Sequence, residues 1–124
     1  MMATHLTIIQ GTPFRASVKI QRRNLAGELV PMDLTGSFVH LQARQHINSL
    51  DTILDLSSTN GGIIVDEQAG SFTIQMSSAQ TSALIWRDHR VAARPVYQCE
   101  VRQSDGETIR VLDSSLTIDP EVVR

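Results

Sequence analysis

Residues 14–21 read FRASVKIQ (Phe14 to Gln21), and their apolar and polar side chains alternate without a break. A β-strand points successive side chains to opposite faces of its sheet, so a period of two places one face in a core and the other in water. This pattern is typical of antiparallel sheets, which commonly bury one face and expose the other. We therefore expect a strand here and an all-β protein around it.

The same pattern recurs along the chain. Four further stretches alternate in this way: Val39 to Arg44, Ser71 to Met76, Tyr97 to Arg102 and Thr108 to Val111. Shorter apolar runs also predict strands, at Leu6 to Ile9, Ile53 to Leu56, Ile63 to Val65 and Leu116 to Ile118. Seven to nine short strands at this spacing favour an antiparallel β-sandwich over a barrel.

Turn residues separate the expected strands. Asp105-Gly106 lies between two alternating stretches, which is the strongest short-range signal of a hairpin. Further turns or loops are expected at Asn60-Gly61-Gly62, Ala69-Gly70 and Asn24 to Leu29. One segment departs from the β pattern, because helix-compatible residues follow a serine that could cap them. It predicts a short helical turn near residues 78–85.

The size and composition of the chain predict one soluble domain. Its 124 residues, 41% of them hydrophobic, suit a single β-sandwich domain over residues 1–124. Residues 1–10 would form an N-terminal arm or edge strand, and residues 119–124 a C-terminal tail. No apolar run approaches the ~20 residues of a membrane span, and no signal peptide is present. We expect no membrane association.

Charge and cysteine content exclude further classes. The 11 Lys and Arg against 13 Asp and Glu give a net charge of −2. Because non-specific binding of nucleic acid requires a positively charged surface, we do not expect it here. Cys99 stands alone, which excludes an intrachain disulfide and predicts a small buried side chain. A reducing cytoplasm is the expected place of folding.

No motif for catalysis or metal binding is present. The four histidines form no i, i+4 pair, and the chain lacks HExxH, CxxC, a phosphate loop and GxSxG. His40 is expected on the solvent-exposed face of its strand. Asp51, Asp55 and Asp66 could gather to bind Ca²⁺, although a solvated rim is the favoured interpretation. We therefore expect no catalytic residue, no metal and no cofactor, and a protein that is not an enzyme.

The most polar and aromatic cluster of the chain has two interpretations. It consists of Trp86, Arg87, Asp88, His89 and Arg90. Tryptophan and arginine are favoured at binding hot spots, so the cluster could be an exposed contact loop. Equally, the tryptophan could cap the core beneath an ordinary loop. Both interpretations stay open at this point.

Short motifs also follow one another in an order that resembles a known family. In chain order they are Gly11-Thr12-Pro13-Phe14, Asp33-Leu34-Thr35-Gly36, Leu41-Gln42-Ala43-Arg44, Gly70 to Ile74, Ser78 to Thr81, the Tyr97 strand, Asp105-Gly106 and Leu116 to Val122. Over residues 11 to 123 this order is similar to the small immunoglobulin-like β-sandwich virion proteins of tailed bacteriophages. That family includes the N-terminal domain of siphophage baseplate upper proteins. Two departures are Tyr97-Gln98 in place of a Tyr-Asp pair, and Asp113-Ser114 near a usual glycine.

The resemblance implies an immunoglobulin-like fold and a structural role in a virion. Such a protein is made in the host bacterial cytoplasm and docks on a symmetric particle. It would be an adaptor or decoration subunit of a tail, neck or head-surface assembly, and it could anchor fibres. The implied partners are other virion proteins (capsid, portal, neck, tail or fibre proteins) and further copies of the chain. A virion location follows from the same resemblance.

Two sets of residues follow from this hypothesis. The fold signature comprises Asp33, Leu34, Thr35, Gly36, Thr81, Asp105 and Gly106. Asp33 is expected to accept backbone N–H groups in a turn with Thr35, and Gly36 to supply an unusual φ. The candidate contact residues are the Trp86 to Arg90 cluster together with Leu6, Ile8, Val122 and Val123. Open strand edges offer docking by strand addition.

Two other function classes remain as alternatives. A host receptor- or carbohydrate-binding module would need exposed aromatic side chains, and the sequence offers Trp86 and Tyr97, the latter predicted to point inward. A hydrolase on a sandwich scaffold is the weaker alternative, because no catalytic motif supports it.

Overall fold

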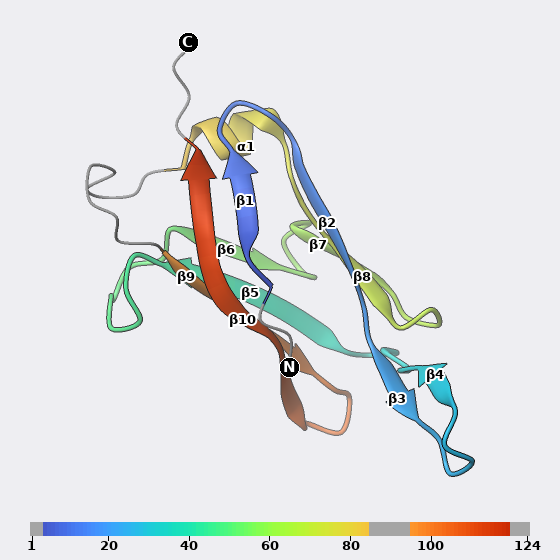
Figure 1. The fold of residues 1–124 in the computed structure, drawn as a ribbon. Coiled ribbons are helices and arrows are strands. Elements are labelled where there is room, and N and C mark those ends of the chain that lie inside the picture. The colour runs from blue at the N-terminus through green and yellow to red at the C-terminus, as the bar shows by residue number, and fades with distance from the viewer. Residues whose placement is uncertain (1–3, 85–94, 120–124) are drawn as a thin grey trace.

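The fold is that of a computed structural model, which describes residues 4–84 and 95–119. Most of this part is β-structure, arranged in several sheets with one short helix (Figure 1). The expectation of an all-β protein is confirmed at this level.

Two larger sheets and one hairpin contain the strands. The five-stranded sheet has the order β1 (Leu6–Ile9), β10 (Thr108–Asp119), β9 (Val96–Arg102), β5 (Phe38–Arg44) and β6 (Leu54–Ser57). The three-stranded sheet has the order β2 (Phe14–Lys19), β8 (Ser71–Met76) and β7 (Ile63–Asp66). The hairpin consists of β3 (Gln21–Arg23) and β4 (Leu29–Pro31).

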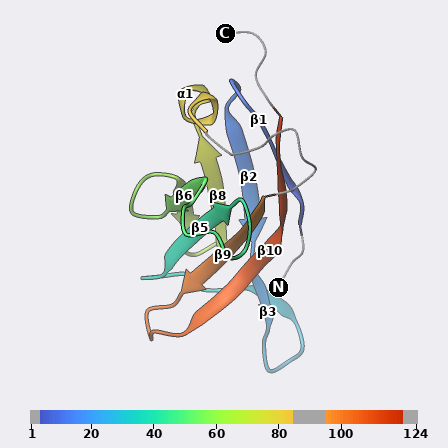
Figure 2. The ribbon, with the colours of Figure 1, turned by 90° about the vertical axis from the view of Figure 1, so that its left-hand side faces the viewer.

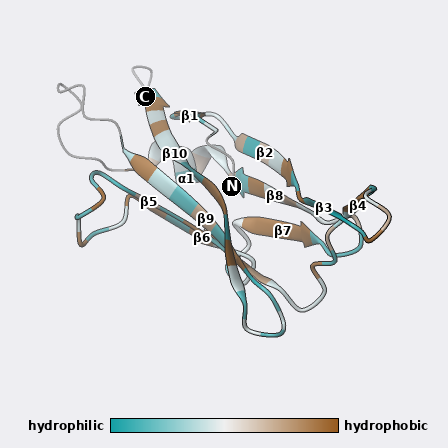
Figure 3. Ribbon diagram, turned by 60° about the horizontal axis from the view of Figure 1, so that its bottom comes forward, coloured by the Kyte–Doolittle hydropathy of each residue, from teal (hydrophilic) through white to brown (hydrophobic). Residues whose placement is uncertain are grey.

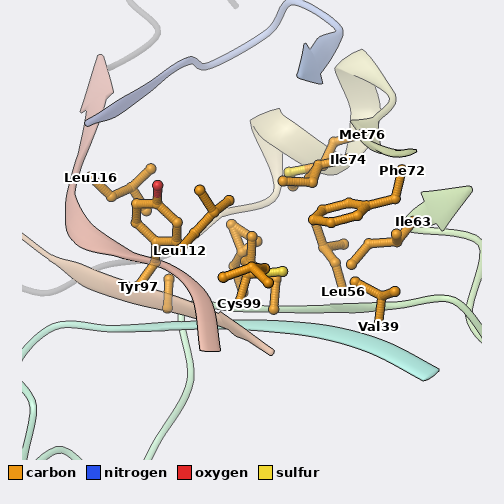
Figure 4. Packing of buried hydrophobic residues seen from close by; sticks show 14 of the residues in the cluster. Val39, Leu56, Ile63, Phe72, Ile74, Met76, Tyr97, Cys99, Leu112 and Leu116 are labelled. Atoms are coloured by element: carbon orange, nitrogen blue, oxygen red, sulfur yellow. The ribbon is translucent and has the colours of Figure 1, made fainter. Parts of the chain in front are cut away.

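Side chains from both larger sheets form one hydrophobic core. Val39 and Tyr97 contribute from the five-stranded sheet, and Phe72 and Ile74 from the three-stranded sheet (Figure 4). Buried and half-buried positions alternate along β5 and β8, as the period of two requires. β7 does not alternate between apolar and polar residues (Figure 3), because Ile64 is apolar although its side of the strand is exposed, at 53%.

The hairpin raises the number of strands in the described residues to ten, above the seven to nine expected. The segment from Asn24 to Leu29 was predicted to be only a loop. In the structure the side chain of Asn24 accepts hydrogen bonds from the backbone N–H groups of Ala26 and Glu28, both at 3.0 Å. This closes a tight turn, so the residues on either side pair as β3 and β4.

β10 unites two strands that were predicted separately. Its pairing with β9 shifts register between Arg110 and Leu112, which is a β-bulge. Val111 and Leu112 are therefore both buried, and the inward positions change from odd to even residue numbers. The alternation breaks at the bulge, although the strand itself continues.

β1 pairs with β10 in parallel, which corrects the expectation of a purely antiparallel arrangement. Leu6 lies opposite Leu116, and Ile8 opposite Ile118. After β1 the chain passes into β2 of the other sheet, so β1 forms no hairpin with its sheet neighbour. The two strands run in the same direction (Figure 1).

The predicted helical turn is present as α1 (Ser78–Ser82). The Ser77 hydroxyl accepts from the Gln80 N–H, and the Gln80 side chain accepts from the Ser77 N–H, which forms a capping box. α1 lies at one end of the molecule, whereas β3 lies at the other (Figure 2).

Candidate functional site

The Asp33 turn has the geometry expected from the sequence. One carboxylate oxygen of Asp33 accepts from the backbone N–H of Thr35 at 3.0 Å and from its hydroxyl at 2.6 Å. These two bonds, with a smaller contribution from Arg22, lower the pKa of Asp33. Leu34 is fully buried, and Gly36 has a φ of +72°. This part of the fold signature therefore anchors a loop.

Thr81 joins the helix to a distant loop. Its buried hydroxyl lies 2.8 Å from the carbonyl oxygen of Thr12 and 3.0 Å from that of Ser78, and it accepts from the N–H of Gly11 at 3.1 Å. The bond to Ser78 is local to the helix, whereas the bonds to Gly11 and Thr12 connect the helix to a segment about 70 positions earlier in the chain.

Asp105 and Gly106 form the turn of the β9–β10 hairpin. The side chain of Asp105 accepts from the N–H of Glu107 at 2.9 Å, and Gly106 has a φ of +91°. The N–H of Gln103 donates to the carbonyl of Glu107 at 2.8 Å and closes the hairpin. This prediction is confirmed.

Of the candidate contact residues, only Leu6 and Ile8 lie within the described part of the chain. Ile8 is 1% exposed and Leu6 packs against the core, because their parallel register with β10 aligns the apolar faces of the two strands. Ile8 is therefore a core residue, which corrects the expectation that it faces a partner, whereas Leu6 is half-buried. The Trp86 to Arg90 cluster lies outside the described residues, as do Val122 and Val123.

Hydrogen bonds hold β1 and the residues before it to the sheet. The His5 ring lies 2.8 Å from the Ser115 hydroxyl and 2.7 Å from the Thr117 hydroxyl. The Tyr97 hydroxyl donates to the carbonyl of Thr4. Burial, together with Cys99 and Asp113, raises the pKa of Tyr97 to about 12. Tyr97 points inward as predicted, so it offers no surface on which a sugar could stack.

The outer face of the five-stranded sheet is polar. His40 and Gln42 of β5 both contact Asp55 of β6, at 2.6 Å and 2.9 Å. Burial acts to raise the pKa of Asp55, but the hydrogen bonds from Gln42 and His40 outweigh it and lower that pKa. Arg110 lies 3.7 Å from Glu100 on the same face.

Calcium binding through Asp51, Asp55 and Asp66 gains no support from these contacts. Asp55 is engaged by His40 and Gln42. Across residues 4–84 and 95–119, no group of three or more His, Cys, Asp or Glu side chains is placed to hold a metal ion. The outer face therefore has the character of a solvated polar surface.

A cleft of about 690 Å³ opens between the β2–β3 segment and the start of β10. We call it the basic cleft. Its apolar lining consists of Ile20, Met32, Ile109 and Val111, and its polar lining of Lys19, Gln21, Arg22, Asp33, Gln103 and Arg110. Lys19 and Arg22 are exposed cations and Asp33 is an anion, whereas the cation Arg110 already lies within 4 Å of Glu100 and Asp113. An apolar floor with a cationic rim suits a ligand that carries both apolar groups and carboxylates.

The edge of β10 beside the basic cleft pairs with no described strand. β1 pairs only with Leu116 to Asp119, which leaves the first part of β10 unpaired on the side away from β9. The sequence did not identify this site. Its only signals were the single lysine, Lys19, and the Arg22-Arg23 pair, and neither indicates which strand edges meet.

No protein-family model matches the chain, and no curated protein is significantly similar to it. Among the described residues, no helix has the length and apolar character that crossing a membrane requires.

Proposed function

We propose that the protein is a non-enzymatic structural subunit of a tailed-bacteriophage virion, an adaptor or decoration protein of a tail, neck or head-surface assembly. We also propose that its two larger sheets form an immunoglobulin-like β-sandwich. The order of short motifs over residues 11 to 123 resembles that family, and the core shared by the two sheets is compatible with a sandwich.

The hydrogen bonds of the fold-signature residues add structural support to this proposal. Three fold-signature residues fix a turn or join two segments: Asp33 accepts from Thr35, Thr81 donates to Thr12, and Asp105 accepts from Glu107. Side chains that fix loops are expected to recur among proteins of one fold, whatever their surfaces bind. These motifs therefore have a structural reason, which is compatible with the proposed immunoglobulin-like fold.

A structural subunit of this kind acts through its surfaces. The outermost strands of the two larger sheets are β1, β6, β2 and β7, and each pairs on one side only among the described residues. Such edges accept further strands through backbone hydrogen bonds. On a symmetric particle, many weak contacts of this kind add to a stable attachment.

The direct test is quantitative mass spectrometry of purified particles of the phage that encodes the chain. We expect the chain in every particle, at a copy number that fits the symmetry of a ring or shell. The matched control is a non-structural protein of the same phage, which should be removed by purification. If the chain is abundant in infected cells but removed with that control, the proposed function is wrong.

A further inference from the structure

The basic cleft has the chemistry of a peptide-binding groove. Ile20, Met32 and Ile109 are half-buried, so the floor is apolar but still accessible. Lys19 and Arg22 are exposed on the rim, and neither forms an ion pair within 4 Å of a described residue. Arg22 lies near enough to Asp33 to lower its pKa, so this anion offsets part of the positive charge.

The backbone beside the cleft can also bind an extended segment. β1 covers only the last four residues of β10, so the N–H and C=O groups of the preceding residues on that side lack a strand partner within the described part of the chain. A strand added there would gain backbone hydrogen bonds, while its side chains would reach the apolar floor and the cationic rim.

The last residue of β10 and the residues after it carry the complementary chemistry. In an extended segment, Asp119 and Glu121 would point to one side, and Pro120 and Val122 to the other. The acidic side matches Lys19 and the other rim cations, and the apolar side matches the floor.

These residues cannot reach the cleft of their own molecule. From Val111 to Asp119, β10 extends about 26 Å at about 3.3 Å per residue, away from the cleft. Glu121 and Val123 reach at most about 7 Å and about 14 Å beyond Asp119. The end of β10 and the β3–β4 hairpin lie at opposite ends of the molecule (Figures 1 and 2).

We propose that the basic cleft binds the segment from Asp119 to Val123 of a second copy of this chain. The contact is head-to-tail, because the cleft of one copy meets the end of β10 of the next. Such heterologous contacts close into rings or continue as filaments. The inference deepens the proposed function, since it names the contact between copies in the particle.

The binding test uses a fluorescent peptide with the sequence of residues 117–124. The receptor is the full chain carrying Asp119→Lys and Glu121→Lys, so that its own segment does not compete. We expect saturable binding by fluorescence anisotropy, weakened about tenfold when Lys19→Ala and Arg22→Ala are added, which remove the cationic rim without making the cleft complementary to the receptor's own lysines. The matched control adds Arg15→Ala and Arg23→Ala, which change the net charge equally at exposed positions outside the cleft.

The assembly test uses light scattering over a concentration series. We expect the mass of the unmodified chain to rise above 13.7 kDa with concentration. The Lys19→Glu/Arg22→Glu and Asp119→Lys/Glu121→Lys variants should each remain monomeric, because like charges then meet. Mixing the two should restore assembly, since each cleft then faces a segment of opposite charge.

Several outcomes would overturn the inference. They are the absence of saturable peptide binding, equal weakening by the rim and control substitutions, and an unmodified chain that stays monomeric throughout. Assembly that is insensitive to the cleft substitutions would place the contact on another surface and would also overturn it. None of these results would change the detection of the chain in particles, which tests the proposed function separately.

Discussion

At the scale of single residues, Thr81 combines complete burial with contacts to two segments. Its hydroxyl bonds to Gly11 and Thr12 as well as to its own helix. Thr81→Val would leave the Gly11 N–H and the Thr12 carbonyl without this partner. We expect the free energy of unfolding to fall by about 1–3 kcal/mol, measured by urea denaturation.

Thr73→Val is the matched control for Thr81→Val. The Thr73 hydroxyl bonds to the Ser17 hydroxyl at 3.1 Å on an exposed face, where water can replace it. We expect a change within about 0.5 kcal/mol. Equal losses from the two substitutions would contradict the role of Thr81 as a tie between segments.

Cys99 should be chemically inert while the protein is folded. It is fully buried, and burial raises the pKa of its thiol to about 12, with a smaller contribution from Glu100. A raised pKa lowers the reactive thiolate fraction, to about 10⁻⁴ at pH 8. We expect iodoacetamide to label the folded chain far more slowly than the urea-unfolded chain, as followed by mass spectrometry. Similar rates in both states would refute this burial.

At the scale of elements, Gly70 marks the contact between the β7–β8 turn and the residue after β4. A Cβ at this position would lie 2.6 Å from the carbonyl oxygen of Met32, and φ is +66°. Gly27 shares the positive φ, at +80°, but a Cβ there would meet nothing within 4 Å. Gly70→Ala should therefore destabilise the fold more than Gly27→Ala, by about 1–3 kcal/mol.

Urea denaturation of the two alanine variants measures this difference. Gly27→Ala reports the cost of the left-handed backbone alone, and the excess for Gly70→Ala reports the displaced backbone of Met32 and Ile20. An equal loss in the two variants would mean that the turn moves away from Met32 without cost.

The strands could be predicted from the sequence wherever apolar and polar side chains alternate without interruption. β5 and β8 follow strict alternation, and the structure confirms them. The bulge in β10 could not be foreseen, because a change in inward positions looks the same in sequence as a break between strands. β3 and β4 were missed since their residues are almost all exposed and carry no core pattern.

At the scale of the whole molecule, stability should be unevenly distributed. β5 and β9 are paired on both sides and contribute buried residues throughout, whereas β3 and β4 form an exposed hairpin. We expect amides of β5 and β9 to exchange with solvent only on global unfolding, and those of the hairpin to exchange by local opening. Hydrogen exchange followed by NMR or mass spectrometry would decide this, and equal protection of both regions would contradict it.

The basic cleft could not be predicted from the sequence, because it forms between segments that are far apart along the chain. Asp33 and Gly106 were identifiable because turn chemistry is local. The basic cleft instead joins Lys19, Met32 and Ile109 from three separate segments. Its walls exist because β1 is shorter than β10 and leaves part of that strand uncovered, and no local pattern encodes that difference in length.

The parallel pairing of the first and last strands also bears on how the chain folds during its synthesis. His5 and Ser115 are hydrogen-bonded although they are 110 positions apart in the sequence. At about 5–20 residues per second, a ribosome needs roughly 5 to 20 s to make that interval. Until then Ile8 lacks its place against Ile118, and closing so long a loop is entropically costly. Of these two strands, β1 is therefore made first, and it can take its place in the sheet only after the end of β10 has been synthesised.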